Sequence, residues 1–138
     1  MSLALALLTW TALTMQRVQA AAIPPPENVP LYVAYTARQY LVPVDLAVCT
    51  AFVESRFAPD ALGDWQDGAP RARGVWQWHA ESWRLAVDLR WEEPVAYRAG
   101  AHDVARATTL ALGMMGDGYA DWWTGWRVCG GILRGEER

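Results

Sequence analysis

The chain has 138 residues, of which 53% are hydrophobic and 20% are charged, and its formal net charge is -3. This length suits one domain with one hydrophobic core, and the composition is that of a folded globular protein rather than a disordered one. The negative net charge, with no cluster among the 12 basic residues, argues against a nucleic-acid-binding protein. The nine tryptophans are the unusual feature, and they predict both core packing and aromatic surfaces of the kind on which sugar rings stack.

Residues 1–22 have the features of an export signal. An apolar run from Leu3 to Leu13 is too short to span a bilayer, and small residues follow it at possible cleavage sites such as 20–22. The usual basic start is missing, so an ordinary helix or the uncleaved start of a phage particle protein is the alternative. Residues 23–29, with three consecutive prolines, predict an extended linker. We therefore expect an exported protein, periplasmic or extracellular and without a stable membrane span, or else a component of a phage virion.

Two helices are predicted in the first half of the remaining chain. Asn28 is a candidate N-cap for a helix that has Pro30 in its first turn and ends near Tyr40. Pro43 opens a second helix, from residue 44 to about residue 56. Its predicted buried stripe consists of Leu46, Ala47, Thr50, Ala51 and Val53. Over residues 61–78 several glycines and a proline break the helical pattern, which predicts a small β-hairpin or an irregular loop.

Helical patterns return after the hairpin. Residues 79–89 place apolar side chains on one face, and Pro94 starts a further short helical turn. Asp103 begins a longer helix with a regular apolar repeat, which Asp117-Gly118 interrupts.

A tryptophan-rich helix is the last predicted element. It covers residues 119–129, and Gly130-Gly131 is expected to end it because glycine often follows the last helical residue. Residues 30–134 are therefore predicted to form one α+β domain, mainly helical with one small β-hairpin.

Glu54 is the strongest candidate for a catalytic residue. It follows Thr50 by four residues and Ala47 by seven, so it lies on or beside the buried stripe, near the C-terminal end of its helix. Partial burial and the negative end of the helix dipole both disfavour a charged carboxylate, so both raise its pKa. Such an acid suits general acid catalysis near neutral pH. The alternative is a surface glutamate that pairs with Arg56 or Arg38.

Two short motifs, about twenty residues apart, indicate a family. The first is the apolar helix that ends in Glu54-Ser55 and continues as Arg56-Phe57-Ala58-Pro59-Asp60-Ala61, and the second is Gly74-Val75-Trp76-Gln77. Over residues 44–84 this pattern resembles the bacterial lytic transglycosylases of the lysozyme-like superfamily, whose second motif is Gly-Leu-Met-Gln. Gly63-Asp64 and the loop after it resemble the hairpin of goose-type lysozymes. The resemblance implies a lysozyme-like catalytic domain.

The same resemblance implies a glycosidase that cleaves the β-1,4 bond between N-acetylmuramic acid and N-acetylglucosamine in peptidoglycan glycan strands. Glu54 would donate a proton to the glycosidic oxygen, and Asp64 would position a water molecule, unless it is only a turn residue. Ser55 and Gln77 would bind substrate, although a serine at this place also commonly bonds its own helix backbone. Further substrate-binding candidates are Trp76 and Tyr119.

Two departures from these families leave the second half of the reaction open. Goose-type enzymes have an aspartate two residues after the glutamine, where this chain has His79. The Ala-Tyr-Asn pattern of lytic transglycosylases is also absent, and Tyr119 and Trp122-Trp123 occupy that region. We expect transglycosylation with a 1,6-anhydro product, with hydrolysis as the alternative. A non-catalytic glycan-binding module of the same fold is the rival of another class, and a phage tail or a secretion apparatus is another setting for the same activity.

The cysteines and histidines complete the list of reactive residues. Neither His79 nor His102 has the neighbours of a metal site, so no metal and no cofactor is predicted. In an exported protein Cys49 and Cys129 are expected to form a disulfide, and two buried thiols are the alternative.

Overall fold

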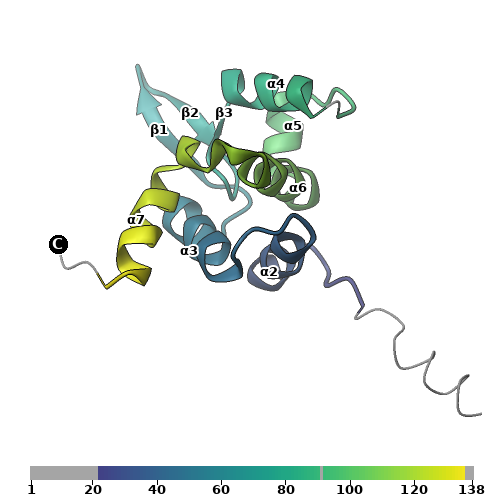
Figure 1. The fold of residues 1–138 in the computed structure, drawn as a ribbon. Coiled ribbons are helices and arrows are strands. Elements are labelled where there is room, and N and C mark those ends of the chain that lie inside the picture. The colour runs from purple at the N-terminus through teal and green to yellow at the C-terminus, as the bar shows by residue number, and fades with distance from the viewer. Residues whose placement is uncertain (1–21, 91, 136–138) are drawn as a thin grey trace, which may run out of the picture.

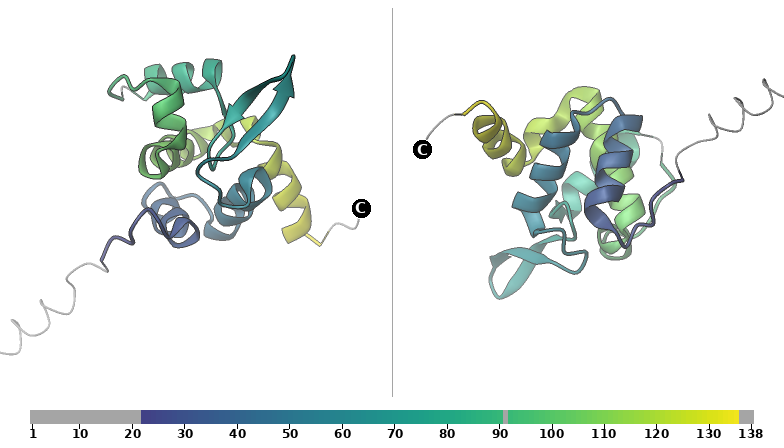
Figure 2. Two further views of the ribbon diagram at one scale, coloured as in Figure 1. Left: turned by 180° about the vertical axis from the view of Figure 1, so that it is seen from behind. Right: turned by 90° about the horizontal axis from the view of Figure 1, so that it is seen from below.

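The computed structural model describes residues 22–90 and 92–135, so the export signal predicted for residues 1–22 lies outside this part of the chain, apart from its last residue. The described part contains six α-helices and a three-stranded antiparallel sheet, which confirms the α+β prediction. Figures 1 and 2 show the sheet projecting as a narrow hairpin from the helical body. None of the helices described combines the length and the apolar character needed to cross a bilayer.

Helices α2 (Val29–Gln39) and α3 (Val44–Ser55) begin and end close to the predicted residues. The two helices pack against each other. Two details of the prediction were wrong. Asn28 holds the N-cap position, but its side chain makes no capping hydrogen bond. Val53 is exposed rather than buried, because it follows the buried Ala51 by two residues and is therefore turned away by about 200°.

The predicted linker, residues 23–29, joins the domain rather than standing apart from it. Its chain has no regular structure up to residue 25, turns, and enters α2 at Val29. Pro24 is buried and Val29 belongs to the core. The domain therefore includes this segment from Pro24 onward.

The predicted hairpin is confirmed, and a short third strand extends it. The strands are β1 (Leu62–Gln66), β2 (Ala69–Arg73) and β3 (Trp78–His79), in the order β1-β2-β3. Gly63 lies opposite Ala72, and Ala72 lies opposite His79. Gly74 follows β2 with a φ of +78°, and a Cβ there would lie 1.8 Å from the carbonyl oxygen of Ala101. Only glycine allows this approach, which places the sheet directly against the next helices.

Three helices follow the sheet: α4 (Ala80–Leu89), α5 (Tyr97–His102) and α6 (Val104–Met114). The start of the short helix α5 was predicted at Pro94, and the helix begins three residues later, at Tyr97. Asp103 begins α6 as predicted, since its side chain accepts a hydrogen bond of 3.0 Å from the backbone N–H of Arg106. Helix α6 contributes an almost continuous run of buried residues, and it forms the centre of the hydrophobic core.

Tryptophans fill the core between α6 and the sheet. Trp76, Trp78, Trp83 and Trp123 are each at most 5% exposed. Trp123 meets the rings of Trp76 and Trp78 edge to face, with centroids 6.3 and 5.1 Å apart. Every one of the four indole N–H groups donates a hydrogen bond within the fold. Core packing therefore explains four of the tryptophans, whereas Trp122 is partly exposed.

The chain turns sharply before its last helix. A π-helical turn (Met115–Tyr119) contains Gly118 at a φ of 101°, which confirms the predicted interruption, and a 3-10 turn (Ala120–Trp122) follows. Helix α7 (Thr124–Leu133) then starts later than predicted and continues through Gly130-Gly131, so the predicted stop was wrong. A glycine inside a helix costs only about 1 kcal/mol, and packing against α3 outweighs this cost. Gly135, at a φ of +72°, follows the real end.

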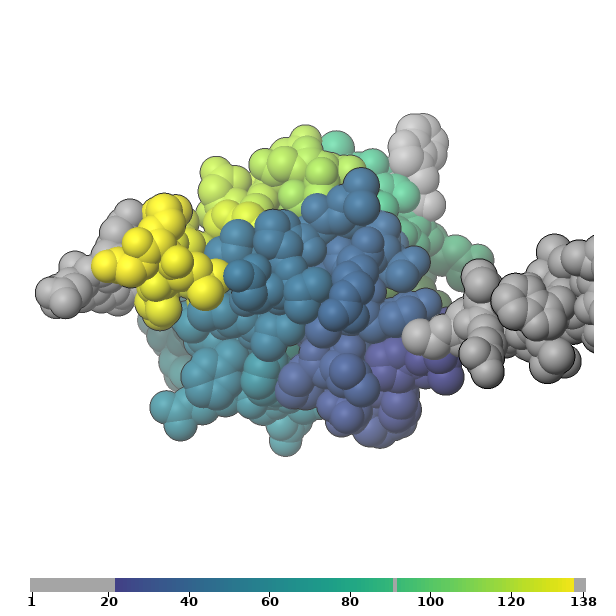
Figure 3. All heavy atoms as spheres, turned by 60° about the horizontal axis from the view of Figure 1, so that its bottom comes forward, coloured from purple at the N-terminus to yellow at the C-terminus, as the bar shows by residue number. Residues whose placement is uncertain are grey.

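A disulfide joins α3 to α7. The sulfur atoms of Cys49 and Cys129 are 2.09 Å apart and their Cα atoms are 5.9 Å apart, which confirms the predicted pairing. Figure 3 shows α3, in blue, directly beside the yellow end of α7. The link holds the C-terminal helix against the helix that carries Glu54.

Candidate active site

Glu54 lies in the last turn of α3, where the first turn of α7 meets it. The backbone N–H of Gly125 donates a hydrogen bond of 2.8 Å to Oε1 of Glu54. The first N–H groups of a helix have no partner within the helix, so the carboxylate satisfies one of them. A Cβ at Gly125 would lie 3.0 Å from both this oxygen and the carbonyl oxygen of Thr50. Among the described residues no ion pair includes Glu54, so the alternative pairing with Arg56 or Arg38 is wrong.

The environment of Glu54 favours its protonated form. The side chain is half-buried, and burial raises the pKa of its carboxyl group above the ordinary value. The hydrogen bond from Gly125 and the positive charge that His79 acquires on protonation both oppose this rise. Burial is the largest of the three influences, so the predicted direction of the pKa shift is confirmed.

A cavity of about 700 Å³ opens in front of Glu54, which is in the range of natural ligand sites. Its wall combines acidic, aromatic and neutral polar side chains from α3, the sheet, the start of α4 and the segment before α7. The lining residues are Glu54, Asp64, Ala72, Gln77, Trp78, His79, Glu81, Ser82, Trp122, Trp123 and Thr124. We call this cavity the cleft. It contains three of the predicted site residues, Glu54, Asp64 and Gln77.

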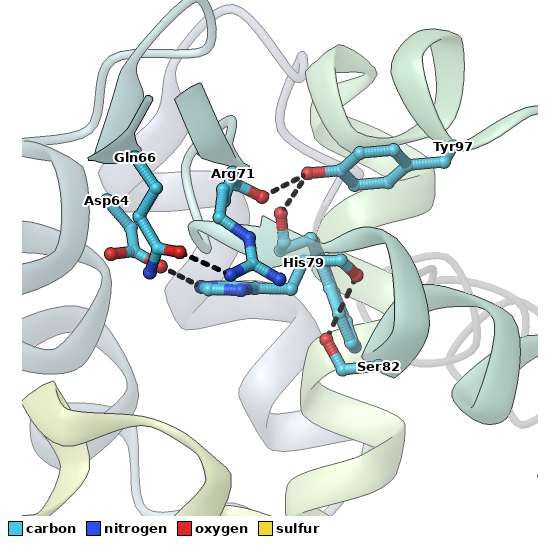
Figure 4. A network of polar contacts seen from close by, with 7 residues as sticks. Asp64, Gln66, Arg71, His79, Ser82 and Tyr97 are labelled. Atoms are coloured by element: carbon cyan, nitrogen blue, oxygen red, sulfur yellow. Dashed lines mark hydrogen bonds and ion pairs between the residues drawn. The ribbon is translucent and has the colours of Figure 1, made fainter. Parts of the chain in front are cut away.

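Asp64 and His79 form a pair on the wall of the cleft. Nε2 of His79 lies 3.5 Å from Oδ2 of Asp64, and each side chain is a little under half exposed. Figure 4 shows the two side chains pointing toward each other from β1 and β3. The hydroxyl group of Ser82 donates a hydrogen bond to the carbonyl oxygen of His79 and fixes the start of α4 to the strand. His79, a departure from the goose-type pattern, therefore belongs to the site.

Gln77 and Ser55 have mainly structural hydrogen bonds. The amide nitrogen of Gln77 donates to the carbonyl oxygens of Gly74 at 3.0 Å and Ala61 at 3.4 Å, so it holds the loop between β2 and β3 at the cleft wall. Ser55 donates to the carbonyl oxygen of Ala51 in its own helix and does not line the cleft. The backbone bond given as the alternative for Ser55 is therefore present, and its predicted contact with substrate stays a prediction.

Trp76 and Tyr119 also lie elsewhere than predicted. The side chain of Trp76 has no exposed surface and donates a hydrogen bond of 3.0 Å to Thr108 in the core. It cannot contact a ligand, because a side chain of this size fills the interior between the sheet and α6. Tyr119 is partly exposed, and its ring lies 5.2 Å from that of Trp122, which itself lines the cleft. Tyr119 therefore contacts a residue of the wall and does not line the cavity.

Several cleft residues were missed by sequence reasoning. The tryptophan content indicated a sugar-binding surface, but it did not single out Trp122. Glu81, Ser82 and Thr124 lie in the first turns of α4 and α7, and helix packing alone brings them to the cleft. No motif marks them.

The cleft combines an acid, a carboxylate–histidine pair and an aromatic surface. Glu54 can donate a proton, the Asp64–His79 pair can hold a water molecule, and the exposed face of Trp122 can stack on a sugar ring. Within the described residues no group of three histidine, cysteine, aspartate or glutamate side chains is gathered as a metal site requires. The chain matches no protein-family model, and no curated protein and no solved structure is significantly similar to it.

Proposed function

We propose that this protein is a peptidoglycan-cleaving glycosidase, a lytic transglycosylase, in which Glu54 is the general acid and base. The observation that carries the proposal is the half-buried carboxyl group of Glu54, with its raised pKa, on the wall of a cleft of about 700 Å³. The resemblance at Glu54-Ser55 and at residues 74–77 supplies the substrate class, the bond between N-acetylmuramic acid and N-acetylglucosamine.

The first step is proton transfer from Glu54 to the glycosidic oxygen as the bond to C1 of the muramyl sugar breaks. The 2-acetamido carbonyl group of that sugar stabilises the positive charge at C1, as in substrate-assisted glycosidases. The Gly125 N–H stabilises the carboxylate that remains, since a hydrogen bond to an ionised acceptor is the stronger one. The N-acetylglucosamine side leaves with the transferred proton.

The second step regenerates the acid. The Glu54 carboxylate removes the proton from the C6 hydroxyl group of the muramyl sugar, and this oxygen attacks C1. A 1,6-anhydro sugar forms, and Glu54 is protonated again. The attacking oxygen belongs to the same sugar, so it has a large advantage in effective concentration over free water.

Hydrolysis is the second candidate reaction, and one observation favours it. Asp64 and His79 line the same cleft as Glu54 and lie 3.5 Å from each other. A water molecule held by this pair would attack C1 in place of the C6 hydroxyl group, and its proton would pass to the pair or to Glu54. The product would then be a reducing-end muramic acid.

The disulfide supports an extracytoplasmic location. Disulfides persist in oxidising compartments and are rare in the cytosol, and Cys49 and Cys129 are bonded in this fold. We propose that the protein acts in the periplasm, outside the cell or in a phage virion, where its partner is the glycan strand of the cell wall.

Digestion of purified peptidoglycan tests the proposal. We expect the wild-type chain to release muropeptides that are lighter by one water than hydrolysed ones, as measured by mass spectrometry. Glu54→Gln should reduce this release by at least ~10²-fold, because an amide cannot donate the proton. Glu27→Gln, an exposed glutamate outside the cleft, is the matched control. Intact walls with bound wild-type chain would instead identify a glycan-binding module, and only reducing-end products would identify a hydrolase.

A further inference from the structure

A second cavity, of about 410 Å³, adjoins the cleft and has a different character. We call it the arginine pocket. It is lined by Pro70, Arg71, Arg73, His79, Ala80, Glu81, Tyr97 and Arg98. His79 and Glu81 also line the cleft, so the two cavities meet at β3 and at the start of α4. A ligand in the cleft therefore lies next to the arginine pocket.

The arginines come from two elements that a tyrosine holds together. Arg71 and Arg73 alternate along β2 and therefore project on the same side of the strand, and Arg98 lies in α5. The hydroxyl group of Tyr97 lies within hydrogen-bond distance of the carbonyl oxygens of Arg71 and Trp78, so α5 is fixed to β2 and β3 (Figure 4). The pocket thus has a defined backbone framework.

The positive charge of the pocket is not neutralised within the described fold. Ion pairs in the described residues join His79 to Asp64 and Arg90 to Asp117, and none includes Arg71, Arg73 or Arg98. Arg71 has only a neutral partner, the side-chain oxygen of Gln66.

The charged side chains that line the arginine pocket have a positive sum. Glu81 is the acidic residue in the lining, against three arginines. Two of these arginines act on the Tyr97 hydroxyl group. Burial raises the pKa of this group, and the positive charges of Arg73 and Arg98 oppose the rise. Guanidinium groups without an acidic partner can bind the carboxylates of a ligand, through paired hydrogen bonds.

We propose that the arginine pocket binds the carboxylates of the stem peptide on the muramyl sugar bound in the cleft. This inference rests on the proposed function, because the glycan strand in the cleft is what brings the peptide there. Peptidoglycan stems carry free carboxylates close to the sugar chain, and the arginine pocket adjoins the cleft at His79 and Glu81. The pocket would select strands that keep their stem peptides over strands that have lost them.

The test compares two soluble substrates: glycan oligomers with their stem peptides, and the same oligomers after an amidase has removed the stems and the lactyl carboxylates that this exposes have been converted to amides. Binding is measured by calorimetry on the chain with Glu54→Gln, so that neither substrate is consumed. The pocket variant adds Arg71→Gln, Arg73→Gln and Arg98→Gln to this background. The matched control instead carries Arg38→Gln, Arg84→Gln and Arg127→Gln, three exposed arginines outside both cavities with the same change in net charge.

We expect the pocket variant to bind stem-bearing oligomers about tenfold more weakly at low ionic strength, a change of about 1.4 kcal/mol. Its binding of stripped oligomers should stay within about twofold of the background, which also shows that it is folded. The control variant should match the background on both. The loss should fade toward 1 M salt, where the screening length is about 3 Å.

Three results would overturn the proposal: no loss, an equal loss on both substrates, or an equal loss in the control variant. Pocket-dependent binding of a glycerol phosphate oligomer instead of the stem-bearing one would assign the pocket to a phosphodiester polymer and would also overturn it. A failure of the proposed function is a separate result, since the wild-type chain would then leave both substrates uncut whatever the binding ratio.

Discussion

At the scale of single residues, Glu54 is subject to opposing influences. Burial favours its neutral form, whereas the Gly125 N–H favours its carboxylate. A general acid needs both, because it must hold a proton before the bond breaks and bear a negative charge afterwards. The balance leaves the pKa raised, which extends the pH range in which the proton is available.

The raised pKa of Glu54 predicts how stability depends on pH. A carboxyl group with a higher pKa in the folded than in the unfolded chain adds stability below its unfolded pKa, and this contribution is lost as the pH rises through its folded pKa. Glu54→Gln cannot ionise and can still accept the Gly125 hydrogen bond. We therefore expect it to melt at a higher temperature than wild type at alkaline pH, and at a similar temperature below the ordinary glutamate pKa of about 4.3. Thermal unfolding followed by circular dichroism measures both, and a variant less stable at alkaline pH would contradict the shift.

Asp64 is predicted to influence the product rather than to be indispensable. If it holds a water molecule with His79, Asp64→Asn should slow hydrolysis more than it weakens substrate binding. The ratio of anhydro to hydrolysed muropeptides, measured by mass spectrometry, should then rise. Asp67→Asn, in the exposed turn of the same hairpin, serves as the control. An unchanged product ratio and turnover would show that Asp64 has no role in the reaction.

At the scale of elements, the contact between α3 and α7 determines the geometry of the site. Gly125 lets the first turn of α7 approach Glu54 and Thr50, whereas the atoms nearest to a Cβ at Gly130, five residues later, belong to the side chain of Arg134. The same substitution at these two glycines should therefore have opposite effects.

Gly125→Ala should weaken both the fold and catalysis. Its Cβ would lie 3.0 Å from Oε1 of Glu54 and from a backbone oxygen, so we expect a loss of about 1–3 kcal/mol in the free energy of unfolding, as for overpacking elsewhere, and slower cleavage. Gly130→Ala should be neutral or stabilising by up to about 1 kcal/mol, because alanine favours a helix over glycine, and the atoms nearest to its Cβ belong to the end of a long side chain rather than to backbone. Urea unfolding and muropeptide release compare the two. Equal effects at both positions would show that the close approach at Gly125 is unimportant.

At the scale of the whole molecule, the disulfide closes a large part of the chain into one loop. Cys49 and Cys129 are 80 residues apart, so their bond restricts the unfolded chain far more than the folded one. Replacing both with serine should cost about 2–4 kcal/mol of stability, measured by chemical denaturation. A strong reductant should destabilise the wild-type chain similarly and leave the double variant unchanged. Equal stability of the two oxidised proteins would contradict this role.

The sequence by itself determined the features that depend on local patterns. Helical spacing located α3, the glycines of residues 61–78 located the hairpin, and the Glu-Ser motif singled out Glu54. The helix start at Asp103 and the interruption at Gly118 could also be predicted from the sequence, because capping and left-handed backbone are properties of a few consecutive residues. The pairing of Cys49 with Cys129 followed from there being two cysteines and an expected oxidising compartment.

Only the tertiary structure decided which side chains meet. Trp76 and Trp122 are the same residue type, yet one is buried and the other lines the cleft, because packing against α6 differs along the chain. Helix α7 continues through Gly130-Gly131 because its contacts with α3 outweigh their weak helix propensity. The hydrogen bond from Gly125 to Glu54 joins residues 71 positions apart. Local periodicity carries no information about such a contact, which depends on how separate helices pack around one core.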